Sequence, residues 1–326
     1  MRVVLRADAG VAQGTGHVMR CLTLAEALLT AGHEALLATN LPEIPWLRAA
    51  VDAAGVRVVP ATPDRIELEE LAAAAPDRIV VDSYRIPAAD VASARTVAPV
   101  LAVVDGSLRG IVADWYLEQN LGSEEVEWRL PAESTMLAGT RYALVRDAIL
   151  RARRPTPWRT RGSLPRVLAF LGGSDPRGLV LPLARSLAAL EVELAVIARP
   201  EHGEALEGVG TIIAPTPELP MLLGQADLVV SAAGTSAWDL CALGVPSVLL
   251  ATVDNQRVSL HRAVADGLAL GIDLVAEGDA AIDRAAGLVA GLLADESARR
   301  EISQRASAAV DGNGKIRVVR AIEAAP

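Results

Sequence analysis

A histidine follows two closely spaced glycines near the start of the chain, in the run Gly14–Thr15–Gly16–His17. Glycines allow a backbone to approach a ligand closely. His17 stands where a helix is expected to begin, and the positive end of the helix dipole disfavours the imidazolium form. A neutral imidazole facing a cleft is suited to general base catalysis. Glycine-rich loops are weak signals, so a polar residue that only caps the helix is the alternative.

Two further glycine-bearing loops follow expected strands in the second half of the chain. They are Gly172–Gly173–Ser174 and Ala233–Gly234–Thr235–Ser236, and the second opens a helix. Free backbone N–H groups and the helix dipole together form an anion site of the kind that binds a diphosphate. Neither loop has the Lys of a Walker loop or a full dinucleotide-binding fingerprint, so ordinary strand-to-helix turns are the alternative.

Polar side chains beyond the second of these loops suit the rest of a nucleotide sugar. Asp239 lies four residues after Thr235, so both share one face of the expected helix, and a carboxylate there can accept two ribose hydroxyls. In Asp254–Asn255–Gln256 the polar side chains follow another strand and can reach sugar hydroxyls. A solvated helix face and ordinary loop polarity explain these residues equally well.

Two sets of parallel strands are needed to carry these loops. Short runs rich in Val, Ile and Leu alternate with helical patterns in both halves of the chain, as in a parallel sheet covered on both faces. The expected strands are Val3–Leu5, Ala35–Ala38, Val56–Val59, Ile79–Val81, Val100–Val104, Val167–Leu171, Leu194–Ile197, Thr211–Ile213, Leu228–Ser231 and Ser247–Leu250. Ligands bind beyond the carboxyl ends of such strands. The sequence therefore predicts an α/β fold of two doubly wound Rossmann-like domains facing a cleft, with Asp82–Ser83–Tyr84 and Asp105–Gly106 pointing into it.

A proline- and arginine-rich stretch, Arg151–Pro165, has no hydrophobic periodicity and is interpreted as a linker with solvated arginines. A chain of 326 residues exceeds what one core usually supports. We therefore expect an N-terminal domain over residues 1–155 and a C-terminal domain over residues 156–326.

Composition limits the classes of function. The net charge of -9 disfavours nucleic acid, which requires a basic face, but permits phosphate bound by backbone N–H groups. The two cysteines, Cys21 and Cys241, lie in apolar helical patterns, and no residues have the spacing of a metal site. No signal peptide and no apolar run of about 18 residues is apparent. We expect a cytoplasmic protein without a membrane span, metal or cofactor.

Taken together, these motifs resemble the PseG family, the UDP-2,4-diacetamido-2,4,6-trideoxy-β-L-altropyranose hydrolases of the pseudaminic acid pathway. The matching stretches are Arg6–Leu28, Val80–Tyr84, Asp114–Asn120, Phe170–Pro176, Ser231–Ser247 and Asp254–Gln256, with a weaker match over Val310–Gly314. They follow the family's order over nearly the whole chain. The run GTGHVMRCLTLA is specific to the family, whereas the AAGTS block is shared with glycosyltransferases of the same fold.

The resemblance implies the glycosyltransferase-B architecture, as in the peptidoglycan N-acetylglucosaminyltransferase, with UDP held by the C-terminal domain and the chemistry supplied by the N-terminal domain. It implies these roles: His17 activates water, Tyr84 and Asn255 line the sugar site, Gly173–Ser174 and Gly234–Ser236 hold the diphosphate, and Asp239 binds the ribose. The chain departs from the family pattern at Ser83, where His is usual, at Gly106, where a second Asp is common, and at Asp239, where Glu is typical. A different sugar, or an acceptor other than water, stays open.

Three classes of function fit these residues. In a UDP-sugar hydrolase, water attacks the anomeric carbon with inversion and releases UDP and a free amino or deoxy sugar, while backbone N–H groups stabilise the leaving diphosphate. In an inverting glycosyltransferase, a small-molecule acceptor replaces water and His17 keeps its role. A non-catalytic nucleotide-sugar-binding protein would have little use for a neutral histidine in a cleft. The sequence predicts the hydrolase, with the glycosyltransferase as the alternative.

Overall fold

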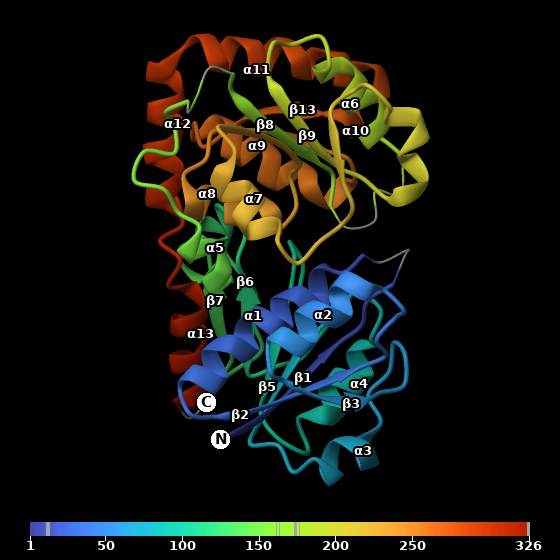
Figure 1. Cartoon of the computed structure of the whole chain (residues 1–326). Helices are drawn as coiled ribbons and strands as arrows, with labels where there is room; N and C mark the ends of the chain where they lie inside the picture. The colour runs from blue at the N-terminus through green and yellow to red at the C-terminus, as the bar shows by residue number, and fades with distance from the viewer. Residues whose placement is uncertain (11–13, 161, 163, 173–174, 176, 325–326) are drawn as a thin grey trace. The chain divides into compact units, whose positions relative to one another are not determined.

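The computed structural model describes residues 1–10, 14–160, 162, 164–172, 175 and 177–324. The chain forms two compact units, which are described separately. Unit 1 comprises Met1–Arg146 and Gly312–Pro326, and unit 2 comprises Asp147–Asp311. Each unit is built on one parallel sheet (Figure 1). The prediction of two parallel-sheet α/β domains is confirmed.

Unit 1 has a seven-stranded sheet in the order β3-β2-β1-β4-β5-β6-β7, with every pair of neighbours parallel. Its strands are β1 (Arg2–Ala7), β2 (Glu34–Thr39), β3 (Arg57–Pro60), β4 (Arg78–Asp82), β5 (Val100–Val103), β6 (Trp115–Glu118) and β7 (Thr135–Ala138). Its helices are α1 (Gly16–Thr30), α2 (Pro45–Ala53), α3 (Leu68–Ala73), α4 (Ala88–Ala94) and α13 (Gly314–Glu323), with short 3-10 turns at Ser123–Glu125 and Thr140–Tyr142.

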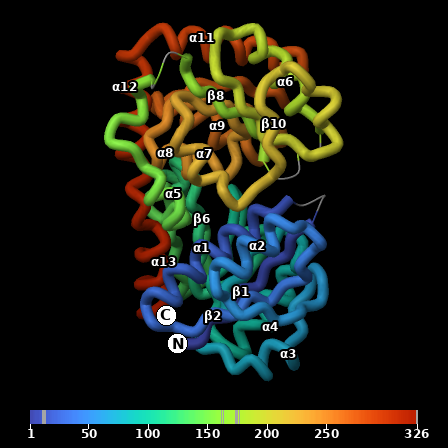
Figure 2. The backbone as a smooth tube through the Cα atoms, in the orientation of Figure 1, coloured from blue at the N-terminus to red at the C-terminus, as the bar shows by residue number. Residues whose placement is uncertain are grey.

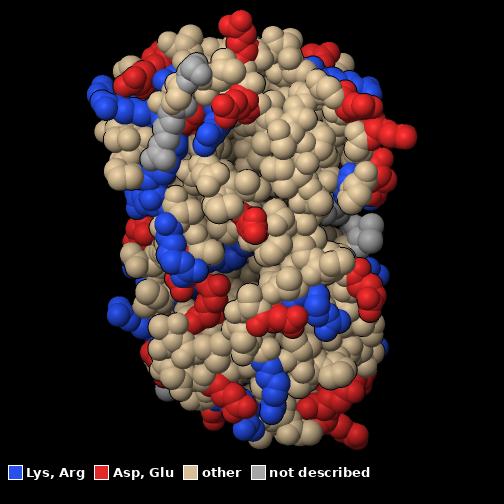
Figure 3. Space-filling view, viewed as in Figure 1, with Lys and Arg blue, Asp and Glu red and all other residues tan. Residues whose placement is uncertain are grey.

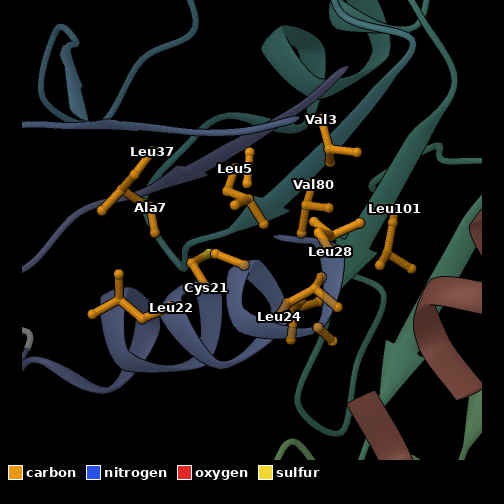
Figure 4. Close-up of a cluster of buried hydrophobic side chains, with 14 of the residues drawn as sticks. Val3, Leu5, Ala7, Cys21, Leu22, Leu24, Leu28, Leu37, Val80 and Leu101 are labelled. Atoms are coloured by element: carbon orange, nitrogen blue, oxygen red, sulfur yellow. The ribbon is translucent and has the colours of Figure 1, made fainter. Parts of the chain in front are cut away.

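Alternation along the strands of unit 1 produces two hydrophobic layers. Val3 and Leu5 of β1 pack on the side of α1, where Cys21 and Leu28 join the same cluster (Figure 4). Val4, between them, belongs to the opposite layer with residues of α3 and α4. Because side chains alternate across a strand, a run of consecutive apolar residues is buried on both faces of the sheet.

Unit 2 has a six-stranded parallel sheet in the order β10-β9-β8-β11-β12-β13. Its strands are β8 (Arg166–Phe170), β9 (Glu193–Ile197), β10 (Thr211–Ile213), β11 (Leu228–Ala232), β12 (Ser247–Ala251) and β13 (Leu270–Asp273). Its helices are α5 (Asp147–Arg151), α6 (Val180–Leu187), α7 (Leu219–Gln225), α8 (Ser236–Leu243), α9 (Arg257–Ala265), α10 (Leu274–Glu277), α11 (Arg284–Ala294) and α12 (Glu296–Ala309). The 3-10 turns are Pro200–His202, Glu204–Leu206, Asp254–Gln256 and Asp279–Asp283. Among the helices described in either unit, none has the length and apolar character needed to cross a membrane.

Each sheet has a point at which the direction of winding reverses. In unit 1, β1 lies between β2 and β4, and in unit 2, β8 lies between β9 and β11. Loops that leave two neighbouring strands in opposite directions open a crevice at the carboxyl ends, where ligands of doubly wound sheets bind. The loops after β1 and β4, and those after β8 and β11, therefore have the positions most suited to function.

The domain boundary lies elsewhere than the composition of Arg151–Pro165 indicates. The chain passes from unit 1 to unit 2 between Arg146 and Asp147, so this stretch belongs to unit 2. Its Arg154 is buried and donates to the Asp227 carboxylate and to the carbonyl of Ala226. The interpretation of a solvated linker is wrong for Arg154, because an arginine can be buried when a carboxylate and carbonyls accept charge-assisted hydrogen bonds from its guanidinium.

The last helix also lies outside the expected domain. α13 follows all of unit 2 in the sequence but packs with α1 in unit 1 (Figure 2). Lys315 is buried and pairs with Glu26 of α1 at 3.0 Å, and Arg78 Nε donates to the carbonyl of Ile322. These contacts complete unit 1 with a segment from the end of the chain.

A glycine at the start of α13 is required by this packing. A Cβ at Gly314 would lie 2.2 Å from the carbonyl oxygen of Ala143, and backbone cannot move aside as a side chain can. We expect Gly314→Ala to lower the free energy of unfolding by about 1–3 kcal/mol and to speed hydrogen exchange in α13. Gly287→Ala is the control, because a Cβ there meets nothing within 4 Å and a helical alanine is favoured. Unchanged exchange in α13 would contradict this account.

Candidate functional site

Unit 1 brings His17 and Asp82 together at its switch point. His17 is the second residue of α1, which follows β1, and Asp82 is the last residue of β4. The register of the two strands pairs Ala7 with Asp82, so the carboxylate emerges beside the start of the helix. His17 Nδ1 lies 2.6 Å from Asp82 Oδ1, and both side chains are buried. The pair is a histidine oriented by a carboxylate.

The ionised partner determines which nitrogen of His17 carries the proton. Burial alone would raise the pKa of Asp82, but the charges of Arg20 and His17 and their hydrogen bonds outweigh it and lower that pKa. An ionised Asp82 can only accept, so His17 Nδ1 donates to it, and Nε2 of the neutral ring keeps its lone pair. Nε2 is then available to take a proton from a substrate.

Arg20 holds the same carboxylate from one turn further along α1. Its Nε donates to Asp82 Oδ2 at 2.7 Å, and its Nη2 donates to Asp82 Oδ1 at 2.6 Å. Its Nη1 reaches Asp105 Oδ2 at 3.3 Å. Arg20 Nη2 also lies 3.0 Å from His17 Nδ1, but neither nitrogen can accept from the other when both carry protons. His17 Nδ1 and Arg20 Nη2 therefore both donate to Asp82 Oδ1.

Asp105, just beyond β5, is held by donors from three segments. Besides Arg20, the hydroxyl of Tyr84 donates to Asp105 Oδ2, and Asn120 Nδ2 donates to Oδ1 at 3.0 Å. Burial would raise the pKa of Asp105, but Arg20 and the hydrogen bond from Tyr84 lower it. Glu118, at the end of β6, accepts from the backbone N–H groups of Gly106 and Asn120. Strands β4 and β6 thus end in a carboxylate and Asp105 follows β5 by two residues, and the carboxylate of Glu118 supports the turn at Gly106.

Tyr84 combines this hydrogen bond with an aromatic contact. Its ring meets that of His17 edge-on, with centroids 4.6 Å apart and planes at 84°. The guanidinium of Arg109 lies 5.3 Å from the Tyr84 ring centroid and donates to the carbonyl of Ser83. Burial, followed by the charge of Asp105, raises the pKa of the phenol, so it stays a donor at neutral pH. Although one edge packs on His17, 43% of Tyr84 is exposed, which leaves ring surface for a ligand.

Other polar residues of the motifs in unit 1 shape the backbone. Ser83 Oγ accepts from the N–H groups of Arg85 and Ile86 and closes the turn after β4. Asp8 accepts two hydrogen bonds from Arg6 and one each from the N–H groups of Asn40 and Asp64. Because both side chains accept from backbone N–H groups, we assign them a structural role.

The glycines before His17 have two different roles. Gly14 has a φ of 76° and exchanges two backbone hydrogen bonds with Gly10, so it is needed for the turn. Gly16 has no such strain, and a Cβ there would meet nothing within 4 Å among the described residues. The fold itself does not require a glycine at Gly16, and the open space on that side suits the approach of a ligand.

In unit 2 the start of α8 lies at the switch point, directly after β11. Gly234, Thr235 and Ser236 make up this turn, and no side chain among the described residues caps the helix. Gln256 lies against it, because its Nε2 would be 3.6 Å from a Cβ placed on Gly234. The N–H groups of Ala237 and Trp238 already donate to the carbonyls of Gly234 and Thr235, so the N–H groups nearest the start of this uncapped turn are the ones suited to bind an anion.

The sequence also predicted an anion site at the loop Gly172–Gly173–Ser174, which precedes α6. Gly173 and Ser174 lie outside the described residues. The start of α6 that follows is already occupied, since the Asp175 carboxylate accepts from the N–H groups of Leu179 and Val180. A carboxylate in that position takes the place an anionic ligand would need, so α8 is the better anion site of the two.

The three remaining candidate residues of unit 2, Asn255, Gln256 and Asp239, differ in exposure and in their hydrogen-bond partners. Asn255 is exposed on the 3-10 turn after β12. The amide oxygen of Gln256 accepts from the N–H and the hydroxyl of Thr252, which fixes this side chain and presents its Nε2 near Gly234. Asp239 is half-buried in the first turn of α8.

Sequence reasoning missed the partners of His17. Asp82 was recognised only as a strand-end carboxylate, and Arg20 only as a member of the glycine–histidine motif. The available signals were the spacing of three residues between His17 and Arg20, which places them on one helix face, and the position of Asp82 at a strand end.

No group of three or more His, Cys, Asp or Glu side chains that could hold a metal is present in the described part of the chain. On the face drawn in Figure 3, acidic and basic side chains are interspersed.

No protein-family model matches the sequence, and no curated protein matches it. Solved structures do match, over nearly the whole chain. A spinosyn rhamnosyltransferase complexed with thymidine diphosphate has a TM-score of 0.67 at 19% identity, covering 99% of this chain and 100% of that chain. The calicheamicin glycosyltransferase has a TM-score of 0.63 at 19% identity, covering 99% and 98%. The chain has the glycosyltransferase-B fold. A putative UDP-N-acetylglucosamine 2-epimerase from Listeria monocytogenes also matches, with a TM-score of 0.69 at 13% identity, covering 99% and 95%. The glycosyltransferase-B fold expected from the sequence is thus confirmed.

The buried Asp82 generates a prediction about stability. Removing one partner of a buried ion pair costs about 3–5 kcal/mol, so we expect Asp82→Asn to destabilise unit 1 by that amount at pH 7. The pKa of Asp82 is lowered in the folded state, so its contribution is complete above its unfolded value and is lost as the pH falls through the folded value. The deficit should therefore shrink below about pH 4.

Urea unfolding followed by hydrogen exchange of the β1 and β4 amides measures this difference at each pH. Asp52→Asn, on the exposed surface of α2, is the control and should change little. A deficit that is small at pH 7, or that grows in acid, would show that Asp82 is not a stabilising carboxylate.

Proposed function

We propose that this chain is an inverting glycosyltransferase that moves a sugar from a nucleoside diphosphate to a small acceptor molecule. The observation that carries the proposal is the His17–Asp82 pair at the switch point of unit 1. In this reaction His17 Nε2 removes the proton of the acceptor hydroxyl or amine as it attacks the anomeric carbon. Asp82 stabilises the imidazolium that forms, as the orienting carboxylate of a catalytic triad does.

The nucleotide is assigned to unit 2. The uncapped start of α8 supplies backbone N–H groups and the positive end of a helix dipole for the diphosphate, which is also the leaving group. Gly234 allows close approach there, because a Cβ would make no contact shorter than 3.6 Å and the residue has no positive φ. We assign Asp239 to the ribose hydroxyls, and Tyr84, Asn255 and Gln256 to the sugar.

The comparisons support transfer to an acceptor more than hydrolysis. Several of the matching solved structures are named as glycosyltransferases, and the spinosyn rhamnosyltransferase was solved both with thymidine diphosphate and with spinosyn aglycone. Those ligands belong to that protein. For this chain they support a nucleoside diphosphate in unit 2 and leave uridine and thymidine both to be tested.

A PseG-like UDP-sugar hydrolase is the second candidate. The observation in its favour is the resemblance over Arg6–Leu28, which contains Gly16, His17 and Arg20. Water would replace the acceptor, and the His17–Asp82 pair would activate it in the same way. Because both reactions use one base and one leaving group, the acceptor alone separates them.

Turnover with and without an acceptor distinguishes the two functions. We expect a panel of UDP- and TDP-sugars to release nucleoside diphosphate at an appreciable rate only when a mixture of hydroxyl- and amine-bearing acceptors is present. Mass spectrometry should then find a glycosylated product with inverted anomeric configuration. Rapid release of free sugar without an acceptor, carrying ¹⁸O from labelled water while the UDP stays unlabelled, would favour the hydrolase. ¹⁸O in the diphosphate would refute attack at carbon and both candidates with it.

Two substitutions should separate catalysis from nucleotide binding. His17→Asn removes the base, so kcat should fall by at least about 100-fold while the affinity for UDP or TDP stays within a few-fold. Asp239→Ala removes a charged acceptor for ribose hydroxyls, a loss of about 1.5–3 kcal/mol, so nucleotide affinity should fall about 10- to 100-fold. Steady-state kinetics and calorimetry measure the two effects.

His261→Asn, a substitution of an exposed histidine of unit 2, is the control and should change neither quantity. If His17→Asn abolishes nucleotide binding together with activity, His17 is structural. If Asp239→Ala leaves the affinity unaltered, the ribose is bound elsewhere.

A further inference from the structure

The charges buried around His17 do not balance among themselves. Asp82 and Asp105 contribute two negative charges, and the guanidinium of Arg20 contributes one positive charge between them. Burial lowers the pKa of Arg20, but the two carboxylates outweigh it and raise that pKa well above its ordinary value. The cluster therefore carries one net negative charge when the ring of His17 is neutral, and none when the ring is protonated.

We infer that Arg20 is a positioning residue, which orients Asp82 toward His17 and limits the negative charge of this cluster to one. The inference rests on the proposed role of His17 as a base. It adds a residue that touches no substrate but determines the direction and the strength of that base.

The positioning role follows from the shape of the guanidinium. Arg20 holds both oxygens of Asp82 in a planar fork, and among the described residues Oδ2 of Asp82 has no other donor. The fork fixes the rotation of the carboxylate so that Oδ1 faces His17 Nδ1. An ammonium group carries the same charge but cannot form the fork, so Lys at this position would keep the charge and lose the orientation.

The charge role follows from the burial of the site. Proton uptake by His17 is favoured by the net negative charge, and a second uncompensated negative charge would favour it more. A base that is too easily protonated is already occupied at neutral pH, so Arg20 keeps the ring available to accept a proton. The titratable and charged groups around the cluster are Cys21 on α1, Arg6 of β1, Asp8 just after β1, Tyr84 after β4, Arg109 after β5, and Glu118 of β6.

These other groups do not change the count. Arg6 and Asp8 compensate each other in a bidentate pair. Burial, followed by the charge of Asp82, raises the pKa of Cys21 well above its ordinary value, so the thiol is uncharged. Glu118 accepts from the backbone of Gly106 and Asn120, and Arg109 contacts Tyr84 and donates to the carbonyl of Ser83; the charges of these two side chains are opposite in sign. Arg20 is the cation that contacts both Asp82 and Asp105.

Nuclear magnetic resonance of the histidine rings tests this inference without any need for turnover. The chain has four histidines, so in protein labelled with ¹⁵N-histidine the signal of His17 is identified by its loss in His17→Asn. In the wild type we expect the neutral form of the ring to carry its proton at Nδ1. In Arg20→Gln we expect the titration midpoint of His17 to rise by about 1–3 pH units. In Asp105→Asn the same midpoint should fall.

Arg20→Lys separates orientation from charge. With the charge retained, the midpoint should stay within about half a unit of the wild type, an amount smaller than the shifts that charge removal produces. With the fork lost, the two neutral tautomers should mix, and kcat should fall while KM changes little. Arg57→Gln, an exposed arginine of the same unit, is the control and should alter neither the midpoint nor the tautomer.

The outcomes distinguish this inference from the proposed function. An unshifted midpoint in both Arg20→Gln and Asp105→Asn overturns the charge role, and a pure Nδ1–H ring in Arg20→Lys overturns the positioning role. If Arg20→Gln fails to fold, Asp105→Asn and Arg20→Lys still decide the two roles. Turnover that survives in His17→Asn would instead refute the proposed base, whatever the titration shows.

Discussion

The ion pair between Arg20 and Asp82 is the interaction on which the organisation of unit 1 at its switch point depends. It joins α1 to the end of β4 with three hydrogen-bonding contacts in a buried environment, if the bond from His17 to Asp82 is included. Leaving either charge without its partner would cost several kcal/mol. The ion pair therefore restricts how the helix is positioned on the sheet, and that position places His17 Nδ1 against Asp82.

The same interaction explains why so many polar side chains accumulate at one edge of a hydrophobic sheet. Arg20 has donors left over after binding Asp82, and one of them reaches Asp105. Asp105 in turn needs further donors, which Tyr84 and Asn120 supply. Because each buried charge needs hydrogen-bond partners, the network extends from one polar side chain to the next and ends at Tyr84, which is partly exposed. Fully paired networks of this kind are rigid, since every member is held from more than one side.

The sequence predicted most of the strands, including the edge strands β3 and β10. All ten expected strands are present, because continuous runs of Val, Ile and Leu are the signal of a parallel sheet covered on both faces. Strands β6, β7 and β13 were missed, because their sequences WYLE, TMLA and LGID lack the continuous runs of Val, Ile and Leu by which the other strands were recognised. Such strands are determined by the neighbour that pairs with them, which local sequence does not reveal.

The site could be predicted only in part for a similar reason. The glycine–histidine motif and the turn before α8 are local patterns, so the sequence indicated them directly. The pairing of His17 with Asp82 spans 65 positions and depends on β4 lying next to β1, which is a property of the topology. The burial of Arg154 and the docking of α13 on α1 were unpredictable from composition, because an arginine-rich stretch and an amphipathic helix look the same whether or not a partner covers them.

The return of α13 to unit 1 has a consequence for how the protein is made. Unit 2 is one continuous segment, Asp147–Asp311, whereas unit 1 needs both Met1–Arg146 and Gly312–Pro326. During synthesis from the N-terminus the first unit to emerge is therefore the last to be completed. Until α13 emerges from the ribosome, the apolar face of α1 that receives Val318 and Ile322 has no cover, and such incomplete surfaces are the ones prone to aggregation. All strands and helices of unit 2 are synthesised before α13. Unit 2 can therefore reach its native state while unit 1 still lacks that helix.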